Sequence, residues 1–532
     1  MQDLAISEER EPRFRGILSR NGTCPAGSVE QPLYFTDLNL DQAVASFVAG
    51  REEYSLNPFF YERLTAIDDV LFRQGVFRDL QRDGPRYCVD AFARAMARVR
   101  SAVERAPSLQ HPCQQEMVFL SAVIAYCEGV ISFSTGLQSV PLESFGLIQF
   151  REYLNAYVES PEFRALDEEA QAVRNCLAHV QYCLTIDGAR VTVTPFASEP
   201  DYAGALRAAF DRFRQESPRG HLARLPEHPE LSRVEAQILD IVTRLFEQDF
   251  ERLHRFFANH QAFLDDGVAA FDREAQVYMG YLEYMERLQR SGLKFCYPTL
   301  VDARDPVFAK DTFDLVLAAT PAAGASRPLG AEGGRQRREI VCNDFSLKGK
   351  ERILVVTGPN QGGKTTFART MGQLYHLAAL GFPVPGSAVQ VSICDEIYTH
   401  FARSEDIARE RGKLEDDIVR MREILARATS CSVVIVNEIF TSTTRRDALV
   451  LGTGLVRALV EMGAVGAYVT FVEELSSLGD AVVSMVSTVP RDDPSGRTFR
   501  VVRLQPRGTA HAMAIADKYG LSYAQVRERL AP

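Results

Sequence analysis

A glycine-rich loop between an expected strand and an expected helix constrains the fold of this chain more than any other feature. The loop is Gly358-Pro359-Asn360-Gln361-Gly362-Gly363-Lys364-Thr365-Thr366; an apolar run at 353–356 precedes it, and a helical pattern follows. A strand, a loop of this spacing and a helix together form the P-loop, whose backbone N–H groups surround phosphate oxygens. The sequence therefore predicts an α/β domain that binds a nucleotide.

The residue types in the loop each have a chemical role. The glycines let the backbone curl towards a phosphate group. Lys364 is expected to reach the β- and γ-phosphates as a cation, and Thr365 to place its hydroxyl on Mg²⁺. ATP and Mg²⁺ are the expected ligands, with all nine loop residues in the binding site. A glycine-rich turn without a ligand is the alternative.

A second motif lies downstream, where the apolar strand Ser432 to Val436 ends in Asn437-Glu438. In P-loop proteins a carboxylate at such a strand tip orders Mg²⁺, and a following Glu polarises the attacking water. Glu438 and Lys364 are therefore the expected catalytic residues. Asn437 is expected to contact Mg²⁺ through water, without the charge of a carboxylate.

The fold class expected from the sequence is α followed by α/β. Residues 1–30 are predicted to form a flexible extension, 31–290 a domain of long helices with a β-hairpin near 182–194, and 291–532 the P-loop domain. A loop is expected at 321–338. The strands expected after it are 353–356, 389–394, 432–436, 465–470, 482–488 and 499–504, with helices at about 405–428 and 446–462.

Composition limits the location and the partners. The formal net charge of −10 gives no global attraction to nucleic acid, so DNA contacts would need local basic clusters, such as those at 335–338 and 445–446. The ten cysteines form no Cys-x-x-Cys pair, which fits a reducing cytoplasm. With a charged N-terminus and no run of about 18 apolar residues elsewhere, no membrane segment is expected.

Further motifs give the chain a resemblance to the MutS family of ABC-type ATPases. The resembling positions are the P-loop, Gly381-Phe382-Pro383-Val384-Pro385, Ile397-Tyr398-Thr399, Ser404-Glu405-Asp406 with the helix to Leu425, Glu438 with Thr443 and Asp447, Thr470, and Gly508 to Ala516. The resemblance rests on motifs over about 300–525 and on helical pattern alone over 31–299. It implies a core and lever domain before the ATPase domain, and a homodimer with ATP between its subunits.

The same resemblance assigns roles to further residues. Ile340 falls where the family usually has an aromatic side chain against adenine. Ser404, Gly412 and Lys413 fall in the signature segment that faces the partner's nucleotide, with Gly412-Lys413 in place of the usual Ser-Thr. Thr470 and Phe471 fall in the switch, with Phe471 in place of the usual His. Since Asn437 also replaces the usual Asp, slow ATP hydrolysis is expected.

Two functions fit this sequence. The first is a MutS-like, ATP-binding homodimer that binds double-stranded or branched DNA in mismatch repair or recombination and is a weak ATPase. The second is a nucleotide-held dimeric scaffold that recruits a protein partner, such as a repair protein, with little or no ATPase activity. Since about 30 residues precede the helical region, the family's mismatch-reading domain is not expected here.

Overall fold

The computed structural model describes residues 14–20, 29–188, 190–196, 233–302, 305–320, 326–328, 335–337, 339–401, 412–490, 496–506, 521 and 525–527. The chain divides into two compact units. The first comprises residues 1–14, 83–142 and 149–272, and the second comprises 15–82, 143–148 and 273–532. The structure is therefore a mixture of a mainly helical unit and an α/β unit.

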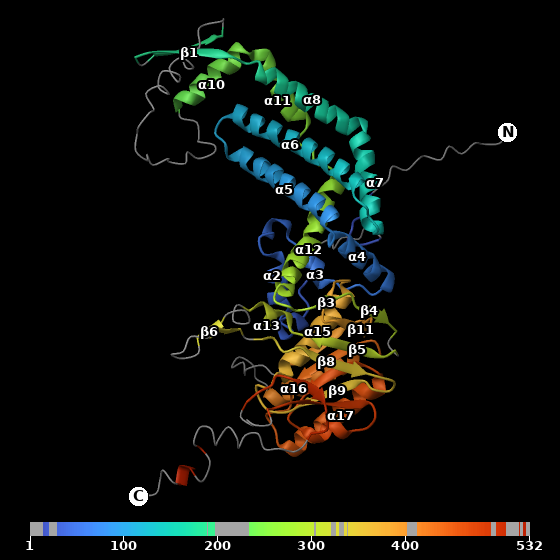
Figure 1. Cartoon of the computed structure of the whole chain (residues 1–532). Helices are drawn as coiled ribbons and strands as arrows, with labels where there is room; N and C mark the ends of the chain where they lie inside the picture. The colour runs from blue at the N-terminus through green and yellow to red at the C-terminus, as the bar shows by residue number, and fades with distance from the viewer. Residues whose placement is uncertain are drawn as a thin grey trace, which may run out of the picture. The chain divides into compact units, whose positions relative to one another are not determined.

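Long helices build the first unit (Figure 1). Its elements are α5 (Asp83–Arg105), η2 (Ala106–Ser108), α6 (Pro112–Ser139), α8 (Pro161–Ala178), β1 (Tyr182–Asp187), β2 (Arg190–Pro195), α10 (Arg233–Leu245) and α11 (Glu247–Asn259), with parts of α7 (Phe145–Glu159) and α12 (Asp266–Gln289). Helices α5 and α6 lie side by side, and Phe92 of α5 stacks on Phe133 of α6 with ring centroids 4.3 Å apart. Stacked aromatic pairs of this kind stabilise helix packing because they bury large apolar surfaces.

Helix α6 has the length and composition of a membrane span, which the sequence analysis did not anticipate. Among the described residues it is the one helix that meets these two criteria, and 56% of its apolar 18-residue window is buried within the protein. Tyr126, Cys127 and Val130 of this helix are fully buried. Burial among neighbouring helices is what the core helix of a bundle requires.

An antiparallel hairpin occupies the segment with alternating apolar and polar residues. Leu184 of β1 pairs with Val193 of β2, and Asp187 pairs with Arg190 beside the turn at Gly188, whose φ is +61°. Because side chains alternate across a strand, paired positions share one face. Tyr182, Leu184 and Ile186 therefore lie on one face, and all three are exposed.

The second unit contains the remaining elements. Its helices are α1 (Tyr34–Asp37), α2 (Leu40–Val48), η1 (Glu52–Tyr54), α3 (Pro58–Tyr61), α4 (Ile67–Leu80), α13 (Leu315–Ala319), α15 (Lys364–Ala379), α16 (Lys413–Arg427), α17 (Arg445–Met462) and η3 (Glu473–Ser477), with part of α7 and of α12. Its shorter sheets use β3 (Phe295–Cys296), β4 (Thr299–Val301), β5 (Val307–Thr312), β6 (Ser326–Pro328), β7 (Arg335–Arg337), β8 (Asn343–Leu347), β10 (Val384–Pro385) and β11 (Ala388–Ser392).

A six-stranded sheet forms the centre of this unit. Its strands are, in spatial order, β12 (Ile397–Phe401), β13 (Val433–Asn437), β14 (Val465–Val469), β9 (Ile353–Thr357), β15 (Val482–Ser487) and β16 (Val501–Arg503). The first five strands are parallel, and β16 runs antiparallel to β15. The carboxyl ends of β9, β13 and β14 therefore meet at one edge, where ligands bind in open α/β sheets.

Helices cover both faces of the sheet, as its almost entirely apolar strands require. Val434 and Val436 point towards α16 and α17, whose buried residues Met421, Leu455 and Leu459 belong to the same core cluster. On the other face, α15 packs against β13 and β14. Helix α17 begins where the Thr444 hydroxyl accepts a hydrogen bond from the backbone N–H of Asp447.

The observed strands differ from the expected ones in two places. The segment expected at 389–394 forms β11, which pairs with β4 and β5 in a separate four-stranded sheet. The edge strand β12 was not predicted, because its five residues follow a short polar turn and resemble a continuation of the preceding strand. The helix expected at 405–428 is observed as Lys413–Arg427, while 402–411 lie outside the described residues.

Two expected loops also contain ordered structure. Within 321–338, β6 and β7 pair as a short antiparallel hairpin. Within 1–30, Ile17 and Leu18 are buried, and their backbone N–H groups donate to the carboxylate of Glu274. The expectation of a flexible extension is therefore wrong for this stretch, because a buried carboxylate fixes its backbone.

Candidate nucleotide-binding site

The glycine-rich loop joins the end of β9 to the start of α15. Gly358 and Gly363 have φ values of +119° and +91°, and Gln361 has a φ of +60°. A Cβ atom at Gly358 would lie 2.7 Å from the carbonyl oxygen of Ser487, so only glycine fits there. The Ser487 hydroxyl also donates to the Gly362 carbonyl across 2.6 Å, which ties the loop to β15.

The Lys364 side chain is folded back over the loop. Its Nζ atom donates to the carbonyl oxygens of Gly358 at 3.0 Å and Pro359 at 3.1 Å, and to Oδ1 of Asn360 at 3.4 Å. It also lies 3.7 Å from Oε1 of Glu438, and its side chain is 4% exposed. Burial lowers the pKa of the Lys364 ammonium, and the Glu438 carboxylate opposes that shift.

Thr365 and Asn437 meet at the carboxyl edge of the sheet. The Thr365 hydroxyl donates a hydrogen bond to Oδ1 of Asn437 across 3.0 Å. Asn437 is the last residue of β13, which is separated from β9 by β14 in the sheet. These two oxygens suit Mg²⁺, which prefers oxygen ligands. Across the described residues there is no group of three His, Cys, Asp or Glu side chains able to hold a metal ion. Nucleotide phosphates and water would have to supply most ligands of a magnesium ion here.

Glu438 occupies a tight turn after β13. Its φ is +53°, and that of Phe440, two residues later, is +58°. Residues other than glycine rarely adopt positive φ values of this size. The Glu438 N–H donates to the Val469 carbonyl at 2.9 Å, and the Phe440 N–H donates to Oδ2 of Asp417 at 3.1 Å. The turn is thus held from β14 and from α16, with the Glu438 carboxylate partly exposed beside Lys364.

The two residues expected to form the switch directly follow β14, the strand between β9 and β13. Thr470 is buried, its N–H donates to the Val356 carbonyl at 3.0 Å, and its hydroxyl accepts from the N–H of Val472 at 3.1 Å. Phe471 is 47% exposed. The phenyl ring offers no hydrogen-bonding group to a phosphate.

The residues expected to form the signature segment lie partly inside and partly outside the described residues. Gly412 precedes α16 as its N-cap residue and offers no side chain to cap it, and Lys413 is the first residue of the helix. Ser404 lies outside the described residues. Helix α16 is anchored instead by Asp417, whose Oδ1 pairs with Nε2 of His400 at 2.7 Å.

One part of the site was missed by sequence reasoning. Residues 496–500 lie beside the loop: Nε of Arg497 donates to the Asn360 carbonyl at 2.9 Å, and the Phe499 backbone approaches Gly363. Asn343 fixes this segment, because its amide donates to the Phe499 carbonyl and accepts from the Val501 N–H. Ile340, the expected adenine contact, is partly buried in the segment before Asn343. No sequence motif signals this long-range pairing.

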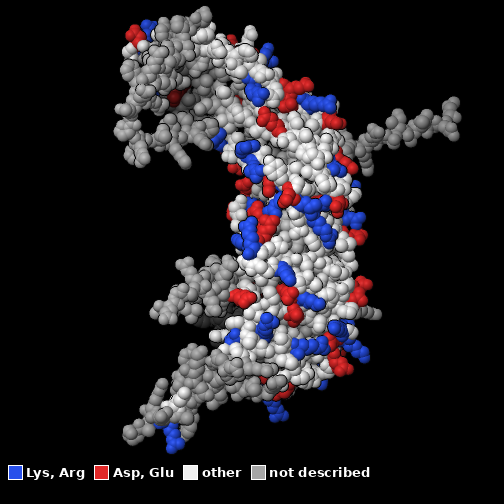
Figure 2. Space-filling view, in the orientation of Figure 1, with Lys and Arg blue, Asp and Glu red and all other residues white. Residues whose placement is uncertain are grey.

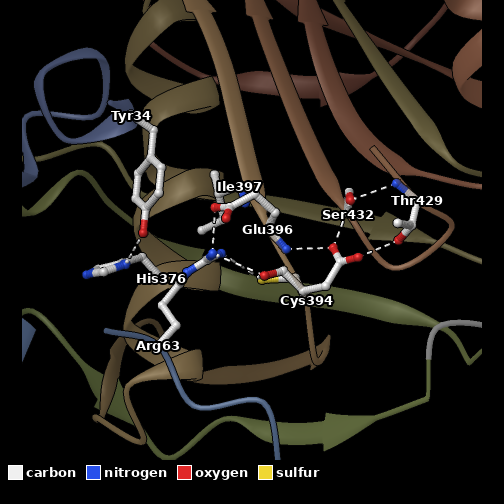
Figure 3. Close-up of polar contacts among 9 residues, drawn as sticks. Tyr34, Arg63, His376, Cys394, Glu396, Ile397, Thr429 and Ser432 are labelled. Atoms are coloured by element: carbon white, nitrogen blue, oxygen red, sulfur yellow. Dashed lines mark hydrogen bonds and ion pairs between the residues drawn. The ribbon is translucent and has the colours of Figure 1, made fainter. Parts of the chain in front are cut away.

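A second polar cluster lies at the opposite edge of the sheet, before β12 and β13 (Figure 3). Arg63 donates to the Asp395 carbonyl at 3.1 Å and pairs with Glu396, while Ser432 donates to Oδ1 of Asp395 at 2.8 Å. Nearby, the Tyr34 hydroxyl lies 3.1 Å from Nδ1 of His376. These contacts connect α15, β12 and β13 to N-terminal residues, and their role is structural.

The parallel sheet, the glycine-rich loop after β9 and the polar tip of β13 together have the arrangement typical of P-loop proteins. Comparison with known proteins narrows this class. Residues 354–525 match the family model for MutS domain V. Over these residues the chain is similar to proteins of the MutS family.

The curated relatives that this chain resembles are longer proteins. The chain is 26% identical over 261 residues to the DNA mismatch repair protein MutS of Shouchella clausii (strain KSM-K16), which is 48% of this chain and 27% of the relative. It is 27% identical over 252 residues to DNA mismatch repair protein MutS of Granulibacter bethesdensis (strain ATCC BAA-1260 / CGDNIH1), or 47% of this chain and 26% of the relative. The chain thus spans about a quarter of the length of the relatives it matches.

Proposed function

We propose that the second unit binds ATP with Mg²⁺ at residues 358–366. The observation that carries this proposal is the meeting of Thr365 and Asn437 at 3.0 Å, with the buried Lys364 ammonium beside them. Phosphate oxygens would replace the loop carbonyls as acceptors for Lys364, and the glycine backbone would supply N–H donors. Thr365 and Asn437 would hold Mg²⁺ directly and through water.

Hydrolysis at this site is proposed to be slow, with Glu438 as the base. Its partly exposed carboxylate, held by the turn after β13, supports this role. Three groups weaken the site: Asn437 lacks a charge, Phe471 lacks a polar atom, and Gly412-Lys413 lacks the signature hydroxyl. Because each group would act on the terminal phosphate or its metal ion, their loss is expected to affect turnover more than binding.

Two copies of the chain are proposed to pair, with Gly412 and Lys413 of one copy facing the nucleotide of the other. Gly412 is exposed and Lys413 partly exposed at the start of α16, which supports this arrangement, since a helix N-terminus favours an anion. Ser404 would belong to the same contact. Nucleotide would then promote dimer formation, which the sedimentation of the full chain with and without ATP would test.

DNA is the proposed macromolecular partner, and the cytoplasm the proposed location. The proposal rests on the relatives, which are named as DNA mismatch repair proteins. On the face shown in Figure 2, Lys and Arg are mixed with Asp and Glu and do not form one basic stripe. Binding through phosphate contacts would therefore be local, and would weaken steeply as salt increases.

Nucleotide binding by a lysine variant tests the central proposal. Lys364→Met keeps the length of the buried side chain but removes its charge, so ATP affinity should fall at least about tenfold, as expected for a charge-assisted contact to phosphate. Lys350→Met, at an exposed position before β9, is the matched control and should bind as wild type does. Calorimetry with Mg²⁺ measures both; an absence of ATP binding in the wild type would reject the proposal.

A nucleotide-held scaffold with little or no turnover is the second candidate. The exposed phenyl ring of Phe471 favours it, because an apolar side chain at the switch suits a protein contact better than phosphate sensing. Titration with linear, mismatched and branched DNA at low salt separates the two candidates. Failure to bind any of them would leave the scaffold as the better account.

A further inference from the structure

We propose that Phe499 is the platform on which the nucleotide base stacks, so that the site selects nucleotides through an aromatic face. This inference rests on the proposed nucleotide binding at 358–366 and adds the residue that contacts the base. The ligand class it implies is a nucleoside triphosphate, with purines favoured because of their larger ring area.

Phe499 lies beside the phosphate-binding loop. A Cβ atom built on Gly363 would lie 3.6 Å from the carbonyl oxygen of Phe499, 3.7 Å from its Cα and 3.8 Å from its Cβ. Gly363 immediately precedes Lys364, the expected phosphate ligand. A side chain at Gly363 would therefore touch Phe499, which places the Cβ of Phe499, where its ring is attached, next to the loop that would hold the phosphates.

The backbone at Phe499 is held in a costly conformation. Its φ of +58° is in the left-handed region, which is uncommon and unfavourable for a bulky residue. Asn343 secures it from both sides: its amide donates to the Phe499 carbonyl at 3.2 Å and accepts from the Val501 N–H at 2.7 Å. Arg497, two residues earlier, is tied to the Asn360 carbonyl of the loop. The structure thus fixes the starting point of this ring relative to the loop.

The ring is also available to a ligand. Phe499 is 38% exposed, although aromatic side chains in the core of this unit are almost fully buried. Every base has a π face, so a phenyl ring stacks on a base without reading its hydrogen-bonding edge. Discrimination between ATP and GTP should therefore be weak, and discrimination against a ligand without a base should be strong.

Ile340 is the competing candidate for the base contact. It is aliphatic and partly buried in the segment before β8. An aliphatic side chain provides van der Waals contact but no aromatic stacking. The two residues can be separated by comparing Ile340→Ala with variants of Phe499.

The test compares ATP with inorganic tripolyphosphate, which has the phosphates but no base. Phe499→Asn removes the ring and keeps a residue that tolerates the left-handed backbone. We expect the Kd for ATP with Mg²⁺ to rise about 5- to 100-fold, while that for tripolyphosphate changes less than about twofold. Phe499→Leu should show a similar loss, and Ile340→Ala a smaller one.

A conservative variant supplies a spectroscopic signature. The sequence contains no tryptophan, so Phe499→Trp introduces a single indole fluorophore. This variant should retain ATP affinity, and ATP should quench its fluorescence while tripolyphosphate should not. A structural role for Phe499 alone would not produce base-dependent quenching.

The outcomes distinguish failure of this inference from failure of the proposed function. If the wild type binds both ligands and Phe499→Asn binds ATP equally well, the base platform is rejected and nucleotide binding stands. Equal losses for ATP and tripolyphosphate in Phe499→Asn would also reject it, because the residue would then support the loop. A wild type that binds neither ligand would overturn the proposed function and this inference together.

Discussion

The Thr365 hydroxyl donates a hydrogen bond to Oδ1 of Asn437 across 3.0 Å, which joins the first turn of α15 to the tip of β13. Asn437 is 8% exposed, so this contact is largely shielded from water. A neutral amide therefore occupies the position at which a carboxylate would add a negative charge next to a bound cation. This relationship makes the metal dependence of the site its most testable property.

Asn437→Asp should strengthen Mg²⁺-dependent ATP binding by about tenfold and raise any turnover. At a separation near 4 Å and an effective dielectric constant near 20, two opposite unit charges attract with an energy of about 4 kcal/mol. A contact mediated by water keeps part of this interaction energy. Calorimetry at a series of Mg²⁺ concentrations and a phosphate-release assay measure the two effects.

Thr365→Val is the control for that experiment, because it removes the hydroxyl and keeps the shape of the side chain. In combination with Asn437→Asp it should abolish most of the gain in Mg²⁺ affinity. If Asn437→Asp alone leaves the Mg²⁺ dependence unchanged, Asn437 does not limit the metal site.

Glu438→Gln should leave ATP affinity within about twofold of wild type and reduce any turnover at least about 100-fold, the usual contribution of a general base. The amide keeps the size of the side chain and one oxygen, and removes the carboxylate charge that lies 3.7 Å from Nζ of Lys364. Single-turnover hydrolysis with saturating protein measures the rate. Equal rates for both proteins would mean that another group activates the water.

Five of the six strands of the central sheet, all except β12, were predictable because they carry local signals. Ile353 to Val356 and Val433 to Val436 are continuous apolar runs, which only a sheet covered on both faces can bury. The loop between β9 and α15 was predictable for the same reason, since its glycines and Lys364 follow a fixed spacing. Local patterns of this kind need no knowledge of the rest of the chain.

Other features of the fold and of the site depend on contacts between residues that are far apart in the sequence. Asn343 fixes Phe499 from 156 positions away, and Ile17 is held by Glu274 from 257 positions away. Nothing in the local sequence marks these partners, because an asparagine or a glutamate is compatible with many exposed positions. The left-handed backbone at Phe499 and Glu438 was equally unpredictable, since local propensity disfavours it.

Asp417→Ala should destabilise the second unit by about 2–4 kcal/mol, because it leaves two buried groups without their acceptor. The Asp417 carboxylate is 3% exposed and accepts from the Phe440 N–H while it pairs with His400. Glu423→Ala, at an exposed position on the same helix, should change stability by less than about 0.5 kcal/mol. Urea denaturation measures both variants, and comparable small effects would show that Asp417 does not anchor the turn after β13.

Acid should destabilise the protein partly through His376, which is fully buried on α15. Burial lowers the pKa of His376 from 6.5 to about 3, and the positive charge of Arg63 adds to this shift. Between these two pKa values the unfolded chain binds a proton at this position that the folded protein does not bind. The stability contribution of neutral His376 is therefore complete above pH 6.5 and is lost as the pH falls towards 3.

Comparison with His376→Gln isolates this contribution, since glutamine does not titrate and can still accept from the Tyr34 hydroxyl, which contacts Nδ1 of His376. Each pH unit below 6.5 costs the wild type about 1.4 kcal/mol, so the difference in unfolding free energy between the two proteins should shrink by about 2 kcal/mol between about pH 7.5 and about pH 5. Urea denaturation at both pH values measures it. A difference that stays constant would mean that His376 binds its proton in the folded protein as readily as in the unfolded chain, and that the packing of Tyr34 and Phe35 around its ring does not exclude the charged form.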